Sequence, residues 1–432
     1  MLVRYIRAMA GGRWVAVASV GLAILVGGLT SGHAGAAAPL HDPTSVDNLT
    51  PPAAPRRVVQ GAAVRLSALR RDARYRDTFL QQFDALTPEN EMKMQMLQPR
   101  RGSFDFRAAD DLVAFAKEHG KRVHGHALVW GLQVPLWLID HGITDKLGLH
   151  LRPLSLPDLP APLNTVVGDV LTSVTGWTRS ELLGIMRHHI DTVVRHFGDD
   201  VPEWDVVNEP MAPNGTLANN VWRRFIGPDY VELALRAAHA ANPRAKLFIN
   251  EYAVEGPSAK LDGLVALVRD LKARNVPLDG VGLQYHTHIQ GFLDEQTLAL
   301  TMRRLADLGV DVQITEMDVA TSLLDGSLEQ RLARQAVAYG DAARACNAVS
   351  ACTRFTTWGV SDSLSWLGAG EMPLLFDSQY DAKPAFSAVR AAFAPRSARK
   401  PRRARRVSRP SKRKRVGVRK PVRATKPHGA RI

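Results

Sequence analysis

Residues with carboxyl and amide side chains directly follow short apolar segments at several points of this 432-residue sequence. In "WDVVNEP" (204–210) and "VDVQITEMD" (310–318), a run rich in valine and isoleucine leads to Glu209 and Glu316, respectively. A buried strand normally continues with apolar residues, so an acid at its end is a candidate for chemistry. Similar segments end on a further polar or aromatic set: Glu89, Asn90, Lys93, His126, Trp130, Asn208, Asn250, Glu251, Tyr252, Gln284, His286, Asp318 and Trp358.

The chemistry open to this set is limited. The sequence has no zinc-ligand pattern, no GxSxG segment, no phosphate-binding loop and no cysteine beside a histidine. We therefore expect neither a metal nor a cofactor, and acyl or phosphoryl transfer is disfavoured. Two carboxyl groups can hydrolyse a glycosidic bond if one is protonated and the other ionised, while amides, imidazoles and tryptophans bind the sugar. The set favours a glycosidase.

Eight apolar segments are predicted to be strands. They lie at 62–67, 83–87, 122–130, 203–209, 246–252, 280–286, 310–318 and 354–360. Helical periodicity separates them, for example in 178–197, which begins with a capping box at Thr178 and Glu181, and in 295–308. This alternation predicts an α/β fold with a parallel sheet, and eight repeats favour a (β/α)8 TIM barrel over a doubly wound sheet. Such a barrel would bring the polar strand ends to one rim.

The motifs resemble those of glycoside hydrolase family 10, the secreted endo-1,4-β-xylanases built on (β/α)8 barrels. They stand here, in the family's order, as "TPENEMK", "GHALVW" followed by Gln133 and Trp137, "WDVVNEP", "INEY", "GLQYH", "ITEMD" and "WGVSDSLSW". The resemblance covers most of 58–394. It implies a single catalytic domain that hydrolyses internal bonds of xylan and xylo-oligosaccharides with retention of configuration (EC 3.2.1.8).

The resemblance also implies roles for individual residues. Glu209 would be the general acid/base and Glu316 the nucleophile, with their carboxyl groups about 5 to 5.5 Å apart. Repulsion between two close negative charges, together with partial burial, is expected to raise the pKa of Glu209 above that of Glu316. Asn208 would bind the sugar 2-hydroxyl or the nucleophile, and Tyr252 would stack on the leaving-group side.

The remaining site residues follow from the same motifs. His286 and Asp318 resemble the pair that holds the nucleophile and fixes its ionisation. The sugar-binding wall on the glycone side would comprise Glu89, Asn90, Lys93, His126, Trp130, Gln133, Gln284, Trp358 and Trp366. For Trp137 and Asp205 we expect structural roles, in core packing and in a buried hydrogen bond.

Two alternatives stay open for the central region. The family usually has a histidine where Gly131 stands, a tryptophan where Met94 stands, and a lysine and tyrosine within "SDSLSW", so subsite affinity is in question. A related barrel glycosidase acting on β-1,4-glucan is one alternative. A polysaccharide-binding protein without activity is the other, although such proteins commonly lose one of the two carboxylates.

Both ends of the chain differ in composition from the middle. Residues 1–38 have three arginines, an apolar run and small residues, which is typical of a cleaved secretory signal rather than a membrane anchor. Residues 39–57 are predicted to be a linker. Residues 395–432 contain 17 lysines and arginines and no acid, which predicts a disordered tail. Without these segments the formal net charge changes from +14 to −6.

A secreted chain rarely meets nucleic acid, so we expect the basic tail to contact anionic polysaccharide or the cell surface instead.

The two cysteines, Cys346 and Cys352, could form a disulfide, which secretion would favour, or remain two buried thiols. Many family members have a disulfide at this place, so the resemblance favours the bridge. Residues 141–176 form a long predicted loop at the rim, which either covers the cleft or is a plain insertion.

Overall fold

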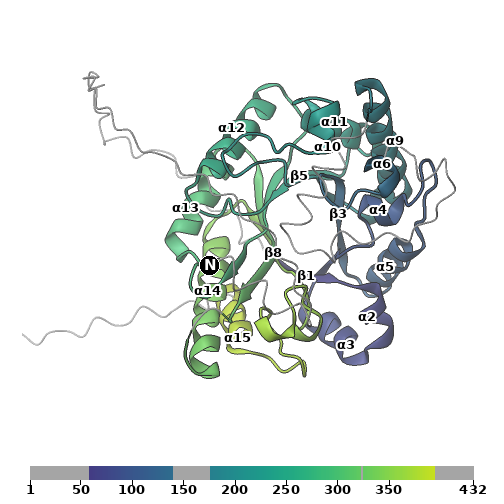
Figure 1. Cartoon of the computed structure of the whole chain (residues 1–432). Helices are drawn as coiled ribbons and strands as arrows, with labels where there is room; N and C mark the ends of the chain where they lie inside the picture. Colours follow the sequence, from purple (N-terminus) through teal and green to yellow (C-terminus); the bar gives the residue numbers. More distant parts are fainter. Residues whose placement is uncertain (1–57, 140–175, 323–324, 395–432) are drawn as a thin grey trace, which may run out of the picture. The chain divides into compact units, whose positions relative to one another are not determined.

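The computed structural model describes residues 58–139, 176–322 and 325–394. In this part the chain forms a parallel (β/α)8 barrel, with the strands inside and the helices outside (Figure 1). The predicted signal, linker and basic tail, and all but the last residue of the 141–176 loop, lie outside the described residues. Within the three described ranges, no helix is long and apolar enough to cross a membrane.

Nine parallel strands make up the sheet of the described part. They are β1 (Val59–Val64), β2 (Ala85–Pro88), β3 (Arg122–Trp130), β4 (Glu203–Asn208), β5 (Lys246–Glu251), β6 (Gly280–Leu283), β7 (His286–His288), β8 (Asp311–Ala320) and β9 (Cys352–Thr357). The order runs from β6 through β1 and β9 to β8, and pairing of β6 with β8 closes the barrel. The short β7 pairs with the carboxyl-terminal end of β8, from Asp318 to Ala320.

All eight predicted strands are present, and two of them differ from the prediction in a way that matters for the site. The predicted strand 280–286 divides into β6 and β7, because Tyr285 has a φ of 60° and turns the chain. The predicted strand 310–318 continues to Ala320, since β7 gives it additional ladder partners. Glu316 and Asp318 therefore lie inside β8, and not behind its end.

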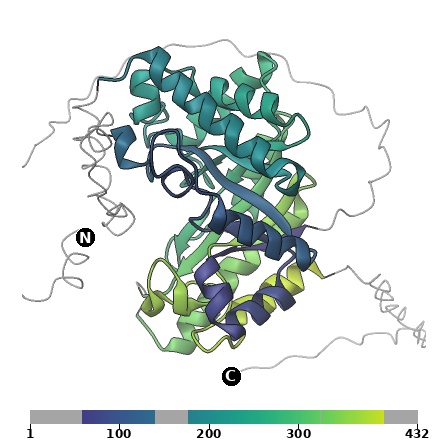
Figure 2. The same ribbon diagram turned by 90° about the vertical axis from the view of Figure 1, so that its right-hand side faces the viewer.

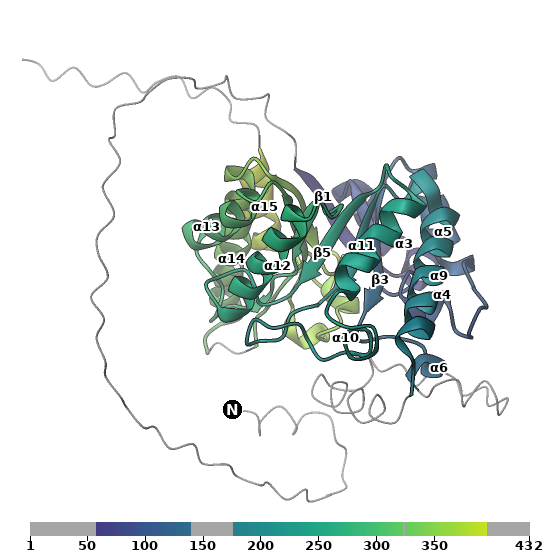
Figure 3. The same ribbon diagram turned by 90° about the horizontal axis from the view of Figure 1, so that it is seen from above.

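The helices form a ring around these strands (Figures 1 to 3). They are α2 (Leu66–Arg71), α3 (Ala73–Gln82), α4 (Met94–Leu97), α5 (Arg107–Glu118), α6 (Leu136–Ile139), α9 (Arg179–Phe197), α10 (Val221–Phe225), α11 (Tyr230–Ala241), α12 (Ala259–Ala273), α13 (Glu295–Ala306), α14 (Leu328–Ala348) and α15 (Pro384–Phe393). The predicted capping box of Thr178 and Glu181 begins α9. Because helices cover the outer face and the barrel encloses the inner one, β2, β6 and nearly all of β8 are buried.

Two expectations about structural residues are confirmed. Cys346, near the end of α14, and Cys352, the first residue of β9, form a disulfide. The Trp137 ring is buried, and its Nε1 donates a 3.0 Å hydrogen bond to the backbone carbonyl of Gln98. The disulfide attaches α14 to β9, and the hydrogen bond attaches α6 to the residue that follows α4.

A chain of charged side chains, which we name the interior column, runs through the barrel towards the carboxyl ends of the strands. Arg354 Nη2 lies 2.8 Å from Glu203 Oε2, and His124 lies 3.3 Å from the same oxygen. The other nitrogen of His124 lies 2.9 Å from Asp205, which in turn lies 2.9 Å from Nδ1 of His126. The buried hydrogen bond expected of Asp205 is therefore present, as one step of a longer chain.

Candidate active site

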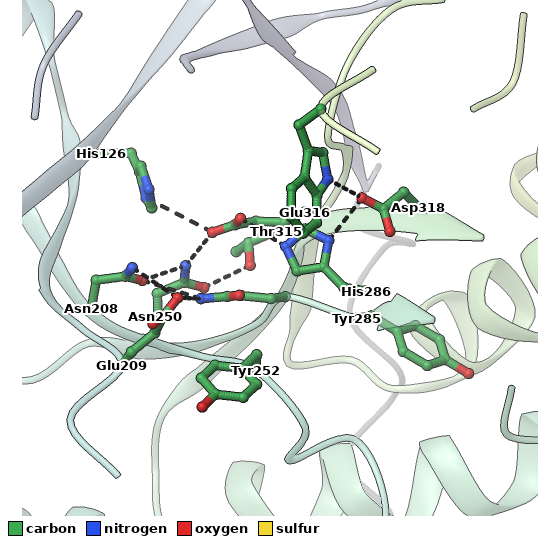
Figure 4. Close-up of polar contacts among 12 residues, drawn as sticks. His126, Asn208, Glu209, Asn250, Tyr252, Tyr285, His286, Thr315, Glu316 and Asp318 are labelled. Atoms are coloured by element: carbon green, nitrogen blue, oxygen red, sulfur yellow. Dashed lines mark hydrogen bonds and ion pairs between the residues drawn. The ribbon is translucent and has the colours of Figure 1, made fainter. Parts of the chain in front are cut away.

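The polar strand ends meet around Glu209 and Glu316 (Figure 4). Glu209 directly follows β4 and has a φ of 55°, in the left-handed region that a residue with a side chain rarely adopts. Glu316 is the sixth residue of β8. In Figure 4, Asn208, Glu209 and Asn250 lie on one side of Glu316, and His286 and Asp318 lie on the other. The two carboxylates are therefore parts of one site.

Glu316 is held by donors on both of its oxygens. Asn250 Nδ2 donates to Oε1 at 2.6 Å, and His286 Nε2 lies 3.1 Å from Oε2. His126 Nδ1 lies 3.9 Å from Oε1. Burial would raise the pKa of Glu316, but the His286 hydrogen bond and the positive charges of His126, His286 and Lys93 outweigh it and lower this pKa. The surroundings thus favour an ionised carboxylate.

Glu209 lies among neutral donors instead. Trp130 Nε1 donates to Oε2 at 3.0 Å, and Gln284 Nε2 donates to Oε1 at 3.1 Å. Burial raises the pKa of Glu209, and the charge of Glu316 adds to the rise, while these two hydrogen bonds and the more distant charge of Lys260 oppose it. The expected direction of the pKa difference is confirmed, but the expected leading cause was wrong: removal from water acts more strongly on Glu209 than repulsion by the second carboxylate.

A chain of amides connects the two carboxylates. Asn208 Nδ2 lies 3.4 Å from Glu209 Oε1, and its carbonyl oxygen accepts a 2.9 Å hydrogen bond from Asn250 Nδ2. That same nitrogen donates to Glu316, while Thr315 Oγ1 donates to the Asn250 carbonyl oxygen at 2.6 Å. Each amide orientation is thereby fixed by its neighbours, so a shift of one carboxylate would be resisted by contacts to the other.

His286 and Asp318 are adjacent because β7 pairs with β8. His286 Nδ1 lies 2.8 Å from Asp318 Oδ2, and Trp366 Nε1 donates to that oxygen at 2.8 Å. Burial alone would lower the pKa of His286, but Asp318 and Glu316 outweigh it and hold this pKa well above its usual value. These two carboxylates favour the protonated ring, and a protonated ring makes a charge-assisted hydrogen bond to Glu316.

The sugar-binding wall predicted from the sequence is partly assembled around Lys93. This buried ammonium lies 5.1 Å from the ring centre of Trp130 and 5.8 Å from that of Trp358, and it donates to Asn90 Oδ1 at 3.2 Å. Burial lowers the pKa of Lys93, and the surrounding glutamates offset part of the change. The ammonium therefore makes cation–π contacts with two indoles.

The other predicted wall residues lie at its edges or apart from it. Glu89 forms a two-bond ion pair with Arg65, at 2.7 Å for each bond. Trp366 is 52% exposed, and its ring centre lies 5.2 Å from that of His286. Gln133 is buried, and its backbone carbonyl accepts the N–H of Gln95, so the structure connects it to α4 rather than to the carboxylates.

Comparisons with known proteins identify the family. A sequence model of glycosyl hydrolase family 10 matches residues 52–392. The chain belongs to glycosyl hydrolase family 10. The membership confirms the resemblance that the motifs suggested, and with it the barrel fold. In the described residues, no group of three or more His, Cys, Asp or Glu side chains is arranged to hold a metal ion.

Named relatives in this family share most of the barrel. The chain is 37% identical over 315 residues to endo-1,4-beta-xylanase A of Thermoanaerobacterium saccharolyticum, covering 71% of this chain but only 24% of that protein. It is 33% identical over 322 residues to endo-1,4-beta-xylanase B of Thermotoga neapolitana, covering 73% of this chain and 82% of that one. The crystal structure of xylanase 10B from Thermotoga petrophila in complex with xylobiose matches with a TM-score of 0.67 and 32% identity, over 78% and 94% of the two chains.

Several residues of this family-10 site were not given a role by the sequence. Asn250 and Glu251 were recognised only as polar residues at a strand end, and Thr315 was not singled out although it precedes Glu316. Their position in "INEY" and "QITEMD", next to residues that were assigned, was the available signal. Lys260 on α12, whose Nζ lies 2.7 Å from Glu251 Oε1, belongs to none of the motifs and had no such signal.

Proposed function

We propose that this protein is an endo-1,4-β-xylanase that cleaves xylan with retention of configuration, using Glu209 as general acid/base and Glu316 as nucleophile. The observation that carries the proposal is that one hydrogen-bonded site holds both carboxyl groups and moves their pKa values in opposite directions. A retaining glycosidase needs this division, since one group must donate a proton while the other attacks as an anion.

In the first step, Glu316 attacks the anomeric carbon and Glu209 protonates the departing glycosidic oxygen. Asn250 and His286 hold one oxygen of Glu316 each, so the attacking carboxylate is oriented before substrate arrives. Trp130 and Gln284 hold both oxygens of Glu209 in the same way. The product of this step is a covalent glycosyl-enzyme on Glu316 and a released sugar chain.

In the second step, Glu209 acts as a base. It has given its proton to the leaving group, so it can remove one from a water molecule that attacks the anomeric carbon. The bond to Glu316 then breaks, and Glu209 is protonated again. Two inversions at the same carbon give net retention.

The test compares the wild-type protein with Glu209→Gln and Glu316→Gln. We expect the wild type to release reducing ends from soluble β-1,4-xylan, and each variant to lose at least about 1,000-fold in kcat/KM, or about 4 kcal/mol of transition-state stabilisation. Trapping with a 2-fluoro-xyloside should label Glu316 in the wild type. Proton NMR of the first product should show the β anomer.

Other outcomes would replace the proposal. Turnover of soluble β-1,4-glucan with no turnover of xylan would show a related glycosidase with a different sugar preference. No turnover of either polymer, combined with retention of xylan on an affinity gel, would favour a binding protein. Full activity in either variant would contradict the assigned roles.

The destination of the chain is a separate proposal. The charged start, apolar run and small residues of 1–38 support secretion with cleavage near residue 38, followed by a 39–57 linker, the 58–394 barrel and the 395–432 tail. Sequencing the amino terminus of protein recovered from the culture medium would test this. An intact amino terminus on cell-retained protein would contradict it.

The tail is proposed to bind anionic polysaccharide through its 17 basic residues. Removing 395–432 should lower retention on a uronic acid polymer at low salt while leaving turnover of soluble xylan unchanged. Because such binding is screened by ions, added salt should remove the difference. Equal retention of both forms at low salt would contradict the proposal.

A further inference from the structure

The acid that follows Asn250 at the end of β5 is completely buried. Glu251 has 0% of its surface exposed, and each of its two oxygens accepts a backbone N–H group. Oε2 accepts from Met211 at 2.8 Å, and Oε1 accepts from Tyr252 at 3.0 Å. Met211 is two residues past Glu209, so a single carboxylate joins the segment that carries Glu209 to the residue expected on the leaving-group side.

Lys260 supplies the opposite charge. Its side chain is 3% exposed, and Nζ lies 2.7 Å from Glu251 Oε1 and 3.1 Å from the centre of the Tyr252 ring. Tyr252 is 38% exposed, so the ammonium covers one side of the ring while part of the side chain remains accessible. Burial raises the pKa of Glu251, and the charge of Lys260 acts against the rise. The contact at 2.7 Å therefore favours the ionised form of Glu251 and opposes the effect of burial.

Two glycines allow α12 to come close enough for this contact. A Cβ at Gly263 would lie 2.0 Å from the carbonyl oxygen of Gly215, and one at Gly215 would lie 2.3 Å from the carbonyl oxygen of Ala259. The backbone of the loop after Glu209 therefore lies directly against the first turn of α12. Any larger residue at these positions would move the helix, and with it Lys260.

We propose that Glu251 and Lys260 are positioning residues for acid catalysis, which set the Glu209 carboxyl against the leaving-group sugar. Glu209 has a left-handed backbone, and such a conformation persists only where the surroundings hold it. The Met211 contact holds that backbone, and the Lys260 contact fixes the plane of Tyr252. The proton donor and the surface for the departing sugar are thereby placed by one buried ion pair. This inference rests on the proposed function of Glu209.

The leaving group provides the test. A xylo-oligosaccharide needs a proton on its departing oxygen, whereas 2,4-dinitrophenolate is so weak a base that it departs without one. The ratio kcat/KM covers only the steps up to the covalent intermediate, so it isolates this difference. For Lys260→Met we expect kcat/KM for xylohexaose to fall at least about 10-fold, and kcat/KM for 2,4-dinitrophenyl xylobioside to change by less than about 3-fold.

Lys383 offers a matched control. It is also a buried lysine, 5% exposed, and its Nζ lies 2.9 Å from Asp362 Oδ2. Lys383→Met removes a comparable ion pair, so it should cost comparable stability and leave the ratio of the two kcat/KM values at its wild-type level. If Lys260→Met melts too low for assay, the Glu251→Gln/Lys260→Met double variant removes both buried charges and should show the same selective loss.

Each outcome decides the point. A selective loss with xylohexaose supports the positioning role. An equal fall in kcat/KM for both substrates overturns it, because a general loss of structure does not distinguish leaving groups. Unchanged kcat/KM for both substrates also overturns it. A wild-type protein that cleaves neither substrate would overturn the proposed function itself, which is a different result from an active wild type with an unchanged ratio.

Discussion

The charge on His286 should help to set the acid limit of activity, and His286→Gln tests this directly. In the wild type, the buried Asp318 lies with its Oδ2 2.8 Å from His286 Nδ1 and favours the protonated ring. A glutamine amide in place of the ring can still donate a hydrogen bond to Glu316, but it carries no charge at any pH. The variant therefore has an ordinary hydrogen bond in place of a charge-assisted one.

The size of the effect follows from the lost charge assistance. A hydrogen bond to a charged partner contributes about 1 kcal/mol more than a neutral one, and 1.36 kcal/mol corresponds to one pKa unit. The pKa of Glu316 is lowered in the wild type, partly by this bond, so it should rise by about 0.7 units in the variant. Because Glu316 must be ionised to attack, the acid limb of kcat/KM should move to higher pH by that amount.

The assay is kcat/KM for an aryl xylobioside, measured from below pH 4 to neutrality, for the wild type, His286→Gln and Trp366→Phe. The last variant removes the other donor to Asp318 and leaves the charge of His286, so its acid limb should stay in place even if sugar binding weakens. An unmoved limb in His286→Gln, or one displaced to lower pH, would show that His286 does not hold Glu316 ionised.

Three further perturbations probe the structure around the site. The pKa of Glu203 is lowered in the folded protein, because the positive charge of Arg354 and the contacts with His124 outweigh the effect of burial. The ionised carboxylate therefore contributes to folding stability. This contribution is fully present above the pKa of Glu203 in the unfolded chain and is lost as the pH falls towards the folded value. The stability advantage of wild type over Glu203→Gln, measured by urea unfolding, should therefore shrink by about 1.4 kcal/mol per pH unit below about pH 4. Replacing Cys346 and Cys352 by alanine should cost roughly 2 kcal/mol in the same assay, since the loop is short. Thr315→Val leaves the Asn250 carbonyl oxygen without its 2.6 Å donor and should lower kcat/KM on xylan about 5-fold or more. An unchanged unfolding midpoint would show that this loss does not come from general destabilisation.

The sequence predicts strand existence well because most strands of the barrel are buried on both faces and therefore appear as largely apolar runs. It also singles out Glu209 and Glu316, because several predicted strand ends share polar residues and the motifs around these two acids resemble those of glycoside hydrolase family 10. The residues at which strands end are predicted less well. Nothing in "GLQYH" shows that Tyr285 turns the chain, yet this turn creates β7 and places His286 beside Asp318.

Contacts between distant segments are the part that the sequence does not contain. Lys260 follows Glu251 by only nine positions, but its approach depends on a contact between the distant Gly215 and Gly263. The interior column has the same character, because Arg354 and Glu203 are 151 positions apart. Such pairs become evident only when the barrel closes.

The division of work between the two glutamates arises from their neighbours more than from each other. Repulsion alone would raise the pKa of either group and would not say which one stays protonated. Glu209 is partly withdrawn from water and meets the neutral donors Trp130 and Gln284, whereas Glu316 meets groups that carry or can carry positive charge, among them His286 and Lys93. Since those cations belong to β7 and to the segment after β2, the barrel assigns the nucleophile by bringing separate strand ends to one side of Glu316. Exchanging the two carboxylates without their surroundings would therefore not exchange their roles.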